Sequence, residues 1–347
     1  KEIKRIRPNE ILVKVDETKQ MLLEAVADSA FPGGVILAAK NGEIFLHKAF
    51  GYHTYSKKKP VMRGNIYDLA SITKVVATTS ALMKLVDEKK LSLDDKVITY
   101  LPEFIGKQKM FFDQKSKVTI RHLITHTSGL PPFKKYFLMD GNIQTKIDSI
   151  MNTEPEIPLN QKMIYSDIGL IVLGKIIESV SQSSLDEYVD SVVFKPLGMK
   201  TTFYNPPIEK IKRIIPTEYS SLYGETIIGY VHDENAKSIG GIAGHAGLFS
   251  TASDLSIFSQ MMLNGGIYGW KRIFKSQSVT NFTKRANTIE GSSRALGWDT
   301  PSGQSSGGVY LSASSFGHTG FTGTSLWIDP ENQIFVILLT NAVHPNR

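Results

Sequence analysis

The sequence predicts an α+β fold, in which an antiparallel sheet is flanked by helices and carries an inserted, mostly helical region. Two observations predict it: apolar runs typical of strands lie near both ends of the chain, and helical spacing of apolar residues dominates the middle. One sheet built from both ends, with segregated helices, is the economical arrangement. We expect the sheet region to span about 10–70 and 238–347 and the helical region about 71–237, within a single domain of residues 10–347. Residues 1–9 are polar and basic and are expected to form a leader or linker.

The strand predictions rest on apolar runs and the turns between them. Val35–Lys40 and Glu43–Phe50 flank an Asn-Gly pair at 41–42, and two apolar runs around Asn-Gly are a strong hairpin signal. Thr324–Ile328 and Gln333–Thr340 are a second pair of apolar runs, joined by a short polar connection. The sequence therefore predicts antiparallel strand pairs at both ends of the chain.

The helix predictions rest on apolar residues spaced three and four apart. A helical pattern covers about Glu10–Ser29, a strong helix begins near Ser71, and another runs from about Ile168 to Val180. A further helix begins at Ser184 in a capping-box pattern and should stop before Pro196. The helix near Ser71 has an apolar face that should pack into a core. That face consists of Ile72, Val75, Val76, Thr79, Leu82, Met83 and Val86.

The composition excludes several classes of protein. The 347 residues include no cysteine, so disulfides, a thiol nucleophile and cysteine-ligated metals are excluded. The net charge is +7, but the lysines and arginines are scattered and no nucleic-acid-binding motif is present, so we expect no nucleic-acid partner. No apolar run approaches the roughly 18 residues of a membrane-spanning helix, so we expect no integral membrane segment.

The residues that suggest chemistry begin at Ser71-Ile72-Thr73-Lys74, an S-x-x-K pattern. Positions three apart lie on one helix face, so the lysine amine can reach the serine hydroxyl. A serine at a helix start lies near free N–H groups that favour a developing anion. By itself the pattern is more typical of a capping serine followed by a solvent-facing lysine, so it needs support from other residues.

Two further elements provide that support. Tyr165-Ser166-Asp167 precedes a predicted helix, and His318-Thr319-Gly320 precedes the final pair of strands. With these elements the chain resembles the class C β-lactamase-like serine hydrolases, which include class C β-lactamases, D-alanyl-D-alanine carboxypeptidases and related carboxylesterases. The three elements of that family are S-x-x-K, Y-x-N and K-T-G, in this order.

The resemblance extends well beyond the three motifs. It covers about Phe31 to Asn341, nearly the whole chain. The stretches Thr119–Leu130, Leu173–Met199 and Gly244–Leu255 also look like the corresponding parts of the family. The resemblance implies a β-lactamase/transpeptidase-like fold, a single catalytic domain, and neither a cofactor nor a metal.

The resemblance also implies a role for each matching residue. Ser71 would attack the substrate carbonyl, and Lys74 and Tyr165 would share the proton transfer. Such a phenol needs a lowered pKa to act as a base, which an adjacent ammonium provides.

The resemblance also implies substrate-binding residues in and next to the third motif. Thr319 and Gly320 would run along the site on an edge strand. The backbone N–H groups of Ser71 and Phe321 would form the oxyanion hole, where each donor is typically worth roughly 3–4 kcal/mol to the transition state.

The sequence departs from the family pattern at two substrate-binding positions. Asp167 replaces an asparagine, so an amide becomes a carboxylate that only accepts hydrogen bonds. His318 replaces a lysine, so a permanent cation becomes an imidazole with an ordinary pKa of about 6.5. Both changes predict that neutral esters are processed better than penicillins at pH 7, and that carboxylate-bearing substrates gain as the pH falls through the histidine pKa.

Other histidines carry weaker signals. His122 and His126 have the spacing of a metal pair, but no third ligand follows at a suitable distance in the sequence, so a metal site is not expected. His245 lies in a glycine-rich turn and is either near the site or structural.

Two readings of function stay open from the sequence. The first is a serine hydrolase that forms an acyl-enzyme on Ser71 and cleaves esters or amides, such as β-lactams or D-amino-acid peptides of the cell wall. The second is a penicillin-binding or sensor domain that acylates without turnover. We expect a small-molecule or peptidoglycan-derived substrate, a periplasmic, secreted or cell-envelope location, and a place in a longer chain if residues 1–9 are a linker. The natural substrate does not follow from the sequence.

Overall fold

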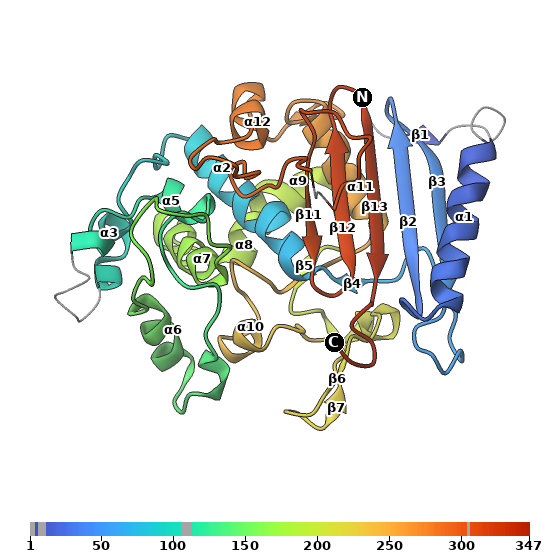
Figure 1. Cartoon of the computed structure of the whole chain (residues 1–347), viewed down its shortest axis with the longest axis horizontal. Coiled ribbons are helices and arrows are strands. Elements are labelled where there is room, and N and C mark those ends of the chain that lie inside the picture. Colours follow the sequence, from blue (N-terminus) through green and yellow to red (C-terminus); the bar gives the residue numbers. More distant parts are fainter. Residues whose placement is uncertain (1–3, 6–11, 106–112, 304–305) are drawn as a thin grey trace.

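The structure is a computed structural model that describes residues 4–5, 12–105, 113–303 and 306–347 (Figure 1). Its main feature is a six-stranded sheet with the strand order β1-β3-β2-β13-β12-β11. All neighbours pair antiparallel except β1 and β3. Helices lie on both sides of the sheet, with a larger group of helices beside it. The α+β prediction is confirmed.

Both ends of the chain contribute neighbouring strands to this sheet. β2 pairs with β13 over seven residue pairs, from Ile334↔Lys40 to Thr340↔Gly34, so the first hairpin and the last strand lie side by side. β1 adds two residues of the segment expected to be a leader or linker to the edge of β3. The strands of this sheet are β1 (Lys4–Arg5), β2 (Gly33–Lys40), β3 (Glu43–Gly51), β11 (Phe316–Gly320), β12 (Thr324–Asp329) and β13 (Ile334–Thr340).

Short strands and helices fill the rest of the described chain. A small three-stranded sheet consists of β4 (Tyr67–Asp68), β8 (Leu248–Ser250) and β5 (Phe203–Tyr204), in that order. Two short hairpins are β6 (Tyr219–Ser220) with β7 (Glu225–Thr226), and β9 (Ile267–Tyr268) with β10 (Lys271–Arg272). The helices are α1 (Leu12–Ala27), α2 (Ser80–Asp87), α3 (Val97–Tyr100), α5 (Ile120–Ile124), α6 (Ile143–Met151), α7 (Asp167–Ser181), α8 (Leu185–Val189), α9 (Lys195–Leu197), α10 (Glu234–Ser238), α11 (Ala252–Leu263) and α12 (Ser276–Thr283).

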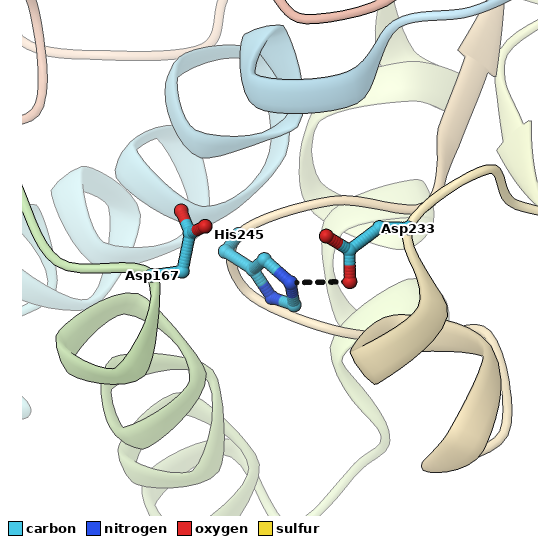
Figure 2. A group of neighbouring side chains, drawn as sticks. All are labelled: Asp167, Asp233 and His245. Carbon is cyan, nitrogen blue, oxygen red and sulfur yellow. Dashed lines mark hydrogen bonds and ion pairs between the residues drawn. The ribbon is translucent and has the colours of Figure 1, made fainter. Parts of the chain in front are cut away.

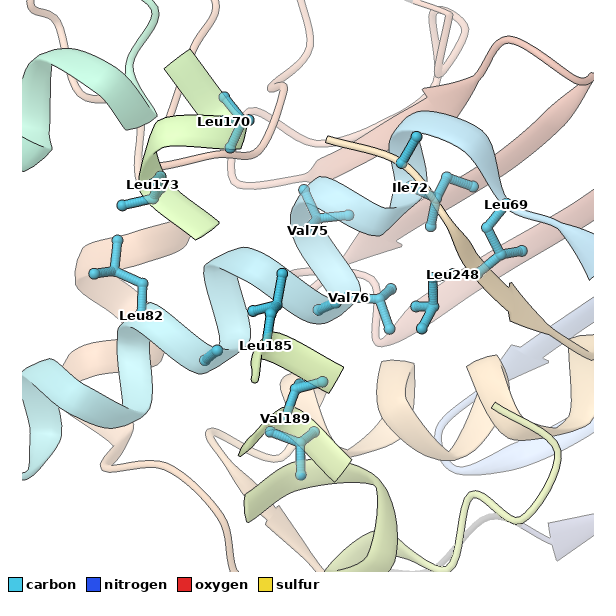
Figure 3. Close-up of a cluster of buried hydrophobic side chains, with 14 of the residues drawn as sticks. Leu69, Ile72, Val75, Val76, Leu82, Leu170, Leu173, Leu185, Val189 and Leu248 are labelled. Carbon is cyan, nitrogen blue, oxygen red and sulfur yellow. The ribbon is translucent and has the colours of Figure 1, made fainter. Parts of the chain in front are cut away.

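The alternation of side chains along β2 divides the core between two faces of the sheet. Val35, Leu37 and Ala39 belong to the large cluster on the side of α11. Ile36 and Ala38 belong to a small cluster that includes residues of α1 and β3. Successive side chains of a strand point to opposite faces, so one strand serves both clusters. The large cluster continues through α2, α7 and α8, where Figure 3 shows its leucines and valines around the helix that follows Ser71.

The helix near Ser71 forms where it is predicted, but not as a regular α-helix. A 3₁₀ turn, Ala70–Ile72, is followed by a π-helical turn, Lys74–Thr79, and then by α2. The Thr79 hydroxyl donates to the Lys74 carbonyl at 2.8 Å, and the Ser80 hydroxyl donates to the Val75 carbonyl at 3.2 Å. Each hydroxyl bonds the carbonyl five residues earlier, which accommodates the wider π geometry. The expected apolar face is nevertheless buried from Ile72 to Met83.

The helix that begins after Ser184 does not stop before Pro196, so this expectation is wrong. α8 continues into a π-helical turn, Asp190–Phe194, and then into α9, whose first turn contains Pro196. A proline is tolerated in the first turn of a helical segment, because the N–H that it lacks has no obligatory partner there. The helix ends instead at Gly198, which adopts φ +74° as a left-handed cap.

No single helix of the described residues is long and apolar enough to cross a membrane. α7 and the run Leu185–Leu197 reach the required length and composition only together, as a pair bent by 70°.

The loop before β8 lies tightly against α7 and the helix that follows Ser71. The Thr78 hydroxyl donates to the Gly244 carbonyl at 2.7 Å. A Cβ added to Gly244 would lie 2.0 Å from the Leu170 carbonyl oxygen and 3.2 Å from the Gly174 nitrogen, both backbone atoms. Only glycine allows this close approach, so it fixes the position of the loop.

We therefore expect Gly244→Ala to lower the free energy of unfolding by about 1–3 kcal/mol, because α7 or the loop must move to make room. Urea unfolding measures the change. Gly303→Ala is the matched control, since a Cβ there meets no atom of the described residues within 4 Å. Equal stability of the two variants would contradict the close approach.

Candidate active site

The fold brings the three predicted motifs together from distant parts of the chain. Ser71 and Lys74 lie at the start of the helical run before α2, Tyr165 and Asp167 lie at the start of α7, and β11 carries the third motif. β11 is the last strand in the order of the sheet, so the predicted edge strand is confirmed. All eight predicted site residues are described. They are Ser71, Lys74, Tyr165, Asp167, His318, Thr319, Gly320 and Phe321.

The turn before Ser71 is held by hydrogen bonds from both sides. Ala70 adopts φ +45°, a conformation that costs a non-glycine residue about 1 kcal/mol or more. The buried carboxylate of Asp68 accepts from the Ala70 N–H at 2.8 Å and from the His232 N–H at 2.7 Å. The Thr322 hydroxyl, just beyond β11, donates to the Asp68 carbonyl at 2.8 Å. These contacts stabilise the strained turn and fix Ser71 beside β11.

The ammonium of Lys74 is the centre of the site. It is buried, with 1% of the residue exposed. Its Nζ lies 2.8 Å from Ser71 Oγ, 2.8 Å from Asp167 Oδ1 and 3.0 Å from the His245 carbonyl oxygen. The contacts with Ser71 and His245 are hydrogen bonds, whereas the contact with Asp167 is an ion pair. The predicted contact between lysine and serine is present, with Asp167 and His245 as additional partners.

The charge of Lys74 is stabilised where it lies. Burial alone would lower the pKa of Lys74, but the carboxylate of Asp167 and the nearby Tyr165 raise the pKa above its ordinary value. Lys74 is therefore charged throughout the neutral pH range. A charged lysine donates to Ser71 Oγ and does not accept its proton.

Tyr165 lies between cations and aromatic rings. Lys74 Nζ is 4.9 Å and Arg294 Cζ is 5.0 Å from the centroid of its ring. The rings of His126 and His318 are 4.7 Å and 5.9 Å from it, centroid to centroid. Both cations would attract a negative charge on this phenol.

His318 is neutral, which corrects the expectation that its charge changes near pH 6.5. Burial, and then the positive charges of Arg294 and Lys74, lower the pKa of His318 to about 3. Its Nδ1 lies 2.7 Å from the Thr319 carbonyl oxygen, and its Nε2 lies 3.4 Å from Arg294 Nη1. These partners fit a neutral ring that donates from Nδ1 and accepts at Nε2.

Arg294 supplies the permanent cation that the third motif lacks. Its guanidinium lies between His318 and the ring of Tyr165, and its buried Nε has no hydrogen-bond partner among the described residues. An arginine stays charged at all physiological pH values and binds carboxylates through two N–H groups. The sequence contained no signal for Arg294, because it lies 24 positions before the histidine and belongs to no motif.

Of the remaining predicted residues, Thr319 and Phe321 line the accessible side of the site, whereas Gly320 is buried. Thr319 is exposed, and 63% of Phe321 is exposed. The Phe321 ring stacks near His232, with centroids 6.0 Å apart. The site therefore has an open aromatic side next to the proposed oxyanion hole.

His245 belongs to the site, which settles the choice that its glycine-rich turn left open. Figure 2 shows its ring between Asp167 and Asp233, and His245 Nε2 lies 2.9 Å from Asp233 Oδ1. The three side chains place one possible metal-binding atom each within 4.8 Å of one another. The ammonium of Lys74 already lies 2.8 Å from Asp167, so the arrangement favours a charge network around this lysine over a metal site.

His122 and His126 do not form the metal pair that their spacing suggests. His122 Nδ1 accepts from the Thr119 N–H at 3.0 Å, whereas His126 Nδ1 accepts from the Ser166 N–H at 3.0 Å. The rings thus bind different segments of backbone. His126 has a structural role behind Tyr165.

Comparisons with known proteins agree with this geometry. The family model described as Beta-lactamase matches residues 18–347. A protein of Salmonella agona named "Putative D-alanyl-D-alanine carboxypeptidase" is 36% identical over 351 residues, which cover 91% of this chain and 80% of that protein. Two solved structures share the fold. EstCE1, described as a hydrolase with promiscuous acyltransferase activity, has a TM-score of 0.76 at 20% identity and covers 94% of this chain and 93% of its own. The octameric penicillin-binding protein homologue from Pyrococcus abyssi has a TM-score of 0.76 at 24% identity and covers 95% of this chain and 74% of its own.

The neutral state of His318 can be measured directly. We expect its imidazole signals in NMR spectra to keep their neutral-form positions from pH 8 down to pH 5, because its pKa is lowered to about 3. An imidazole with the ordinary pKa of about 6.5 would be mostly protonated at pH 5. The signals that disappear in His318→Asn identify the residue. A titration of these signals near pH 6.5 would contradict the buried, neutral ring.

Proposed function

Because this chain belongs to the β-lactamase family and is a serine hydrolase, we propose that it cleaves its substrate through an acyl-enzyme on Ser71. The observation that carries this proposal is the contact of Ser71 Oγ with the buried, charged Lys74 at 2.8 Å. The ammonium orients the hydroxyl, and the strained turn presents it next to β11. Residues 10–347 would act as one catalytic domain.

Tyr165 is the base in this proposal. Although burial alone would lower the pKa of Lys74, Asp167 and Tyr165 raise that pKa and hold the lysine in its charged form, so the proton of Ser71 has to go to another group. Tyr165 enters this step as a phenolate, and Ser71 Oγ attacks the carbonyl carbon while its proton moves to the phenolate oxygen. The resulting oxyanion accepts hydrogen bonds from the N–H groups of Ser71 and Phe321. Tyr165 then returns the proton to the leaving group, and the acyl-enzyme forms.

Hydrolysis of the acyl-enzyme uses the same groups. A water molecule gives its proton to Tyr165 as it attacks the ester carbonyl, and Tyr165 returns this proton to Ser71 when the acid leaves. Asp167 holds Lys74 in its charged form throughout. The carboxylate at this position thus assigns the base role to the phenol, in place of the shared roles that the motif alone implies.

We propose a substrate with a carboxylate beyond the scissile bond, of the kind found in peptides that end in D-Ala-D-Ala. Arg294 beside His318 would bind that carboxylate as the permanent cation of the site. The name of the Salmonella relative agrees with a cell-wall peptide as substrate. A peptidoglycan-derived substrate would place the enzyme in the periplasm, outside the cell or in the cell envelope.

Ser71 can be tested by covalent labelling. We expect a fluorophosphonate to label the protein at Ser71, with mass spectrometry locating the adduct, and Ser71→Ala to remain unlabelled. The wild type should turn over a p-nitrophenyl ester for many cycles per enzyme. Ser71→Ala should lower kcat/KM for this ester at least about a thousandfold. An adduct on another serine would contradict the assignment, and a single burst without further turnover would favour a sensor over a hydrolase.

Arg294 can be tested with matched substrates. We expect Arg294→Met to lower kcat/KM for a peptide ending in D-Ala-D-Ala by about 10- to 100-fold, because a charge-assisted hydrogen bond is lost. The same variant should lower kcat/KM for a neutral ester by a clearly smaller factor, which reports only the loss of a cation beside the base Tyr165. The wild-type preference between the two substrates should stay constant from pH 5 to pH 8, since arginine does not titrate there. An equal loss for both substrates would contradict a carboxylate-binding role.

A further inference from the structure

We propose that Asp233 and His245 form a positioning pair that acts on catalysis through Lys74. The inference rests on the proposed roles of Ser71 and Lys74 and adds two residues outside the three motifs. Asp233 binds the ring of His245 and holds it in place. The backbone carbonyl of His245 accepts a hydrogen bond from the Lys74 ammonium and so orients it.

The carbonyl of His245 is a partner that only a well-placed loop can offer. Ser71 and Asp167 bind Lys74 with side chains from helical segments, whereas His245 binds it from a loop 171 positions away in the sequence. A backbone acceptor cannot adjust by choosing another rotamer, so its position depends on how the loop is anchored. The anchors of this loop therefore control the direction in which the ammonium points.

Three anchors hold the loop around His245. The Thr78 hydroxyl binds the Gly244 carbonyl on one side, and the Leu248 N–H donates to the Thr73 hydroxyl at 3.1 Å on the other. Both partners belong to the helical run that carries Lys74. The third anchor is the side chain of His245, which is 1% exposed and reaches Asp233.

Asp233 is itself fixed in place. Its Oδ1 also accepts from the Ala236 N–H at 2.7 Å, as the N-cap of α10. Although burial alone would raise the pKa of Asp233, its contact with the His245 ring, the hydrogen bond from the Ala236 N–H and the more distant Lys74 hold that pKa well below its ordinary value. The carboxylate is therefore charged, and it attracts both the ring of His245 and the ammonium of Lys74.

The pair thus adds a second carboxylate to the surroundings of Lys74. Asp167 touches the ammonium from α7, and Asp233 acts from the far side of the His245 ring (Figure 2). Removal of a nearby anion lowers the pKa of a lysine, because the charged form loses attraction. The titratable and charged groups that face Lys74 from the elements around it are Tyr165, Asp167, Asp233, His245, His126, His318 and Arg294.

Asp233→Asn separates this role from helix capping, because asparagine caps a helix about as well as aspartate does. With a neutral p-nitrophenyl ester, we expect the variant to lower kcat by about 10- to 100-fold with KM changed less than about twofold. The alkaline limb of its kcat/KM profile should move to lower pH, because Lys74 loses its proton more readily. His245→Ala should lower kcat in the same way, since the loop loses its side-chain anchor.

Asp254→Asn is the matched control. Asp254 is also a buried carboxylate that accepts from a backbone N–H, the N–H of Thr201 at 2.7 Å, but it lies in the first turn of α11. The variant Asp254→Asn should leave the alkaline limb of the kcat/KM profile unmoved, even if the thermal midpoint of this variant falls. Thermal midpoints of all variants identify any loss of activity that comes from unfolding.

The outcomes separate this inference from the proposed function. A wild-type enzyme that fluorophosphonate does not label at Ser71 would overturn the proposed function. A wild-type enzyme that is labelled at Ser71, with kcat and alkaline limb unchanged in Asp233→Asn and His245→Ala, would overturn the positioning pair alone. A lowered kcat with an unmoved limb in a folded Asp233→Asn would also overturn it, because a purely structural role predicts that result.

Discussion

The rest of the site depends on one buried charge, the ammonium of Lys74. A buried lysine is tolerated only when its charge is balanced and its N–H groups are bound. Here the carboxylate of Asp167, the hydroxyl of Ser71 and the carbonyl of His245 meet that requirement together. The requirement also bears on the proposed chemistry, because a lysine held in its charged form cannot act as a base, and this leaves the proposed role of base to Tyr165.

The same charge organises the surrounding electrostatics. Lys74 and Arg294 both lie about 5 Å from the centroid of the Tyr165 ring, and together with burial they keep His318 neutral. The charge beside the third motif therefore comes from the two cations and not from the imidazole of His318. His318 stands where the family has a lysine, so the third motif itself carries no permanent cation. The site still has one, because Arg294 lies beside His318.

The sequence was informative where a pattern is local. The strands around residues 41–42, helix α7 and the three motifs all follow from short-range spacing, and the family resemblance placed them in one site. Arg294, Asp233 and the His245 carbonyl reach Lys74 or Tyr165 through tertiary contacts, so no spacing could reveal them. The neutral state of His318 also depends on burial and on Arg294. The π-helical turn after Ser71 depends on two hydroxyls whose competition with the backbone is visible only in the structure.

The pairing of β2 with β13 has a consequence for how the enzyme comes into being. The strand that carries the third motif can join the sheet only after β12 and β13 are in place, and β13 pairs with a strand about 300 residues earlier. Contacts of such long sequence separation form late and slowly during folding. A nascent chain therefore has its serine and lysine long before it has β11, and it stays catalytically silent until its last strands leave the ribosome. The topology of the sheet thus ties the appearance of activity to the strands that are made last.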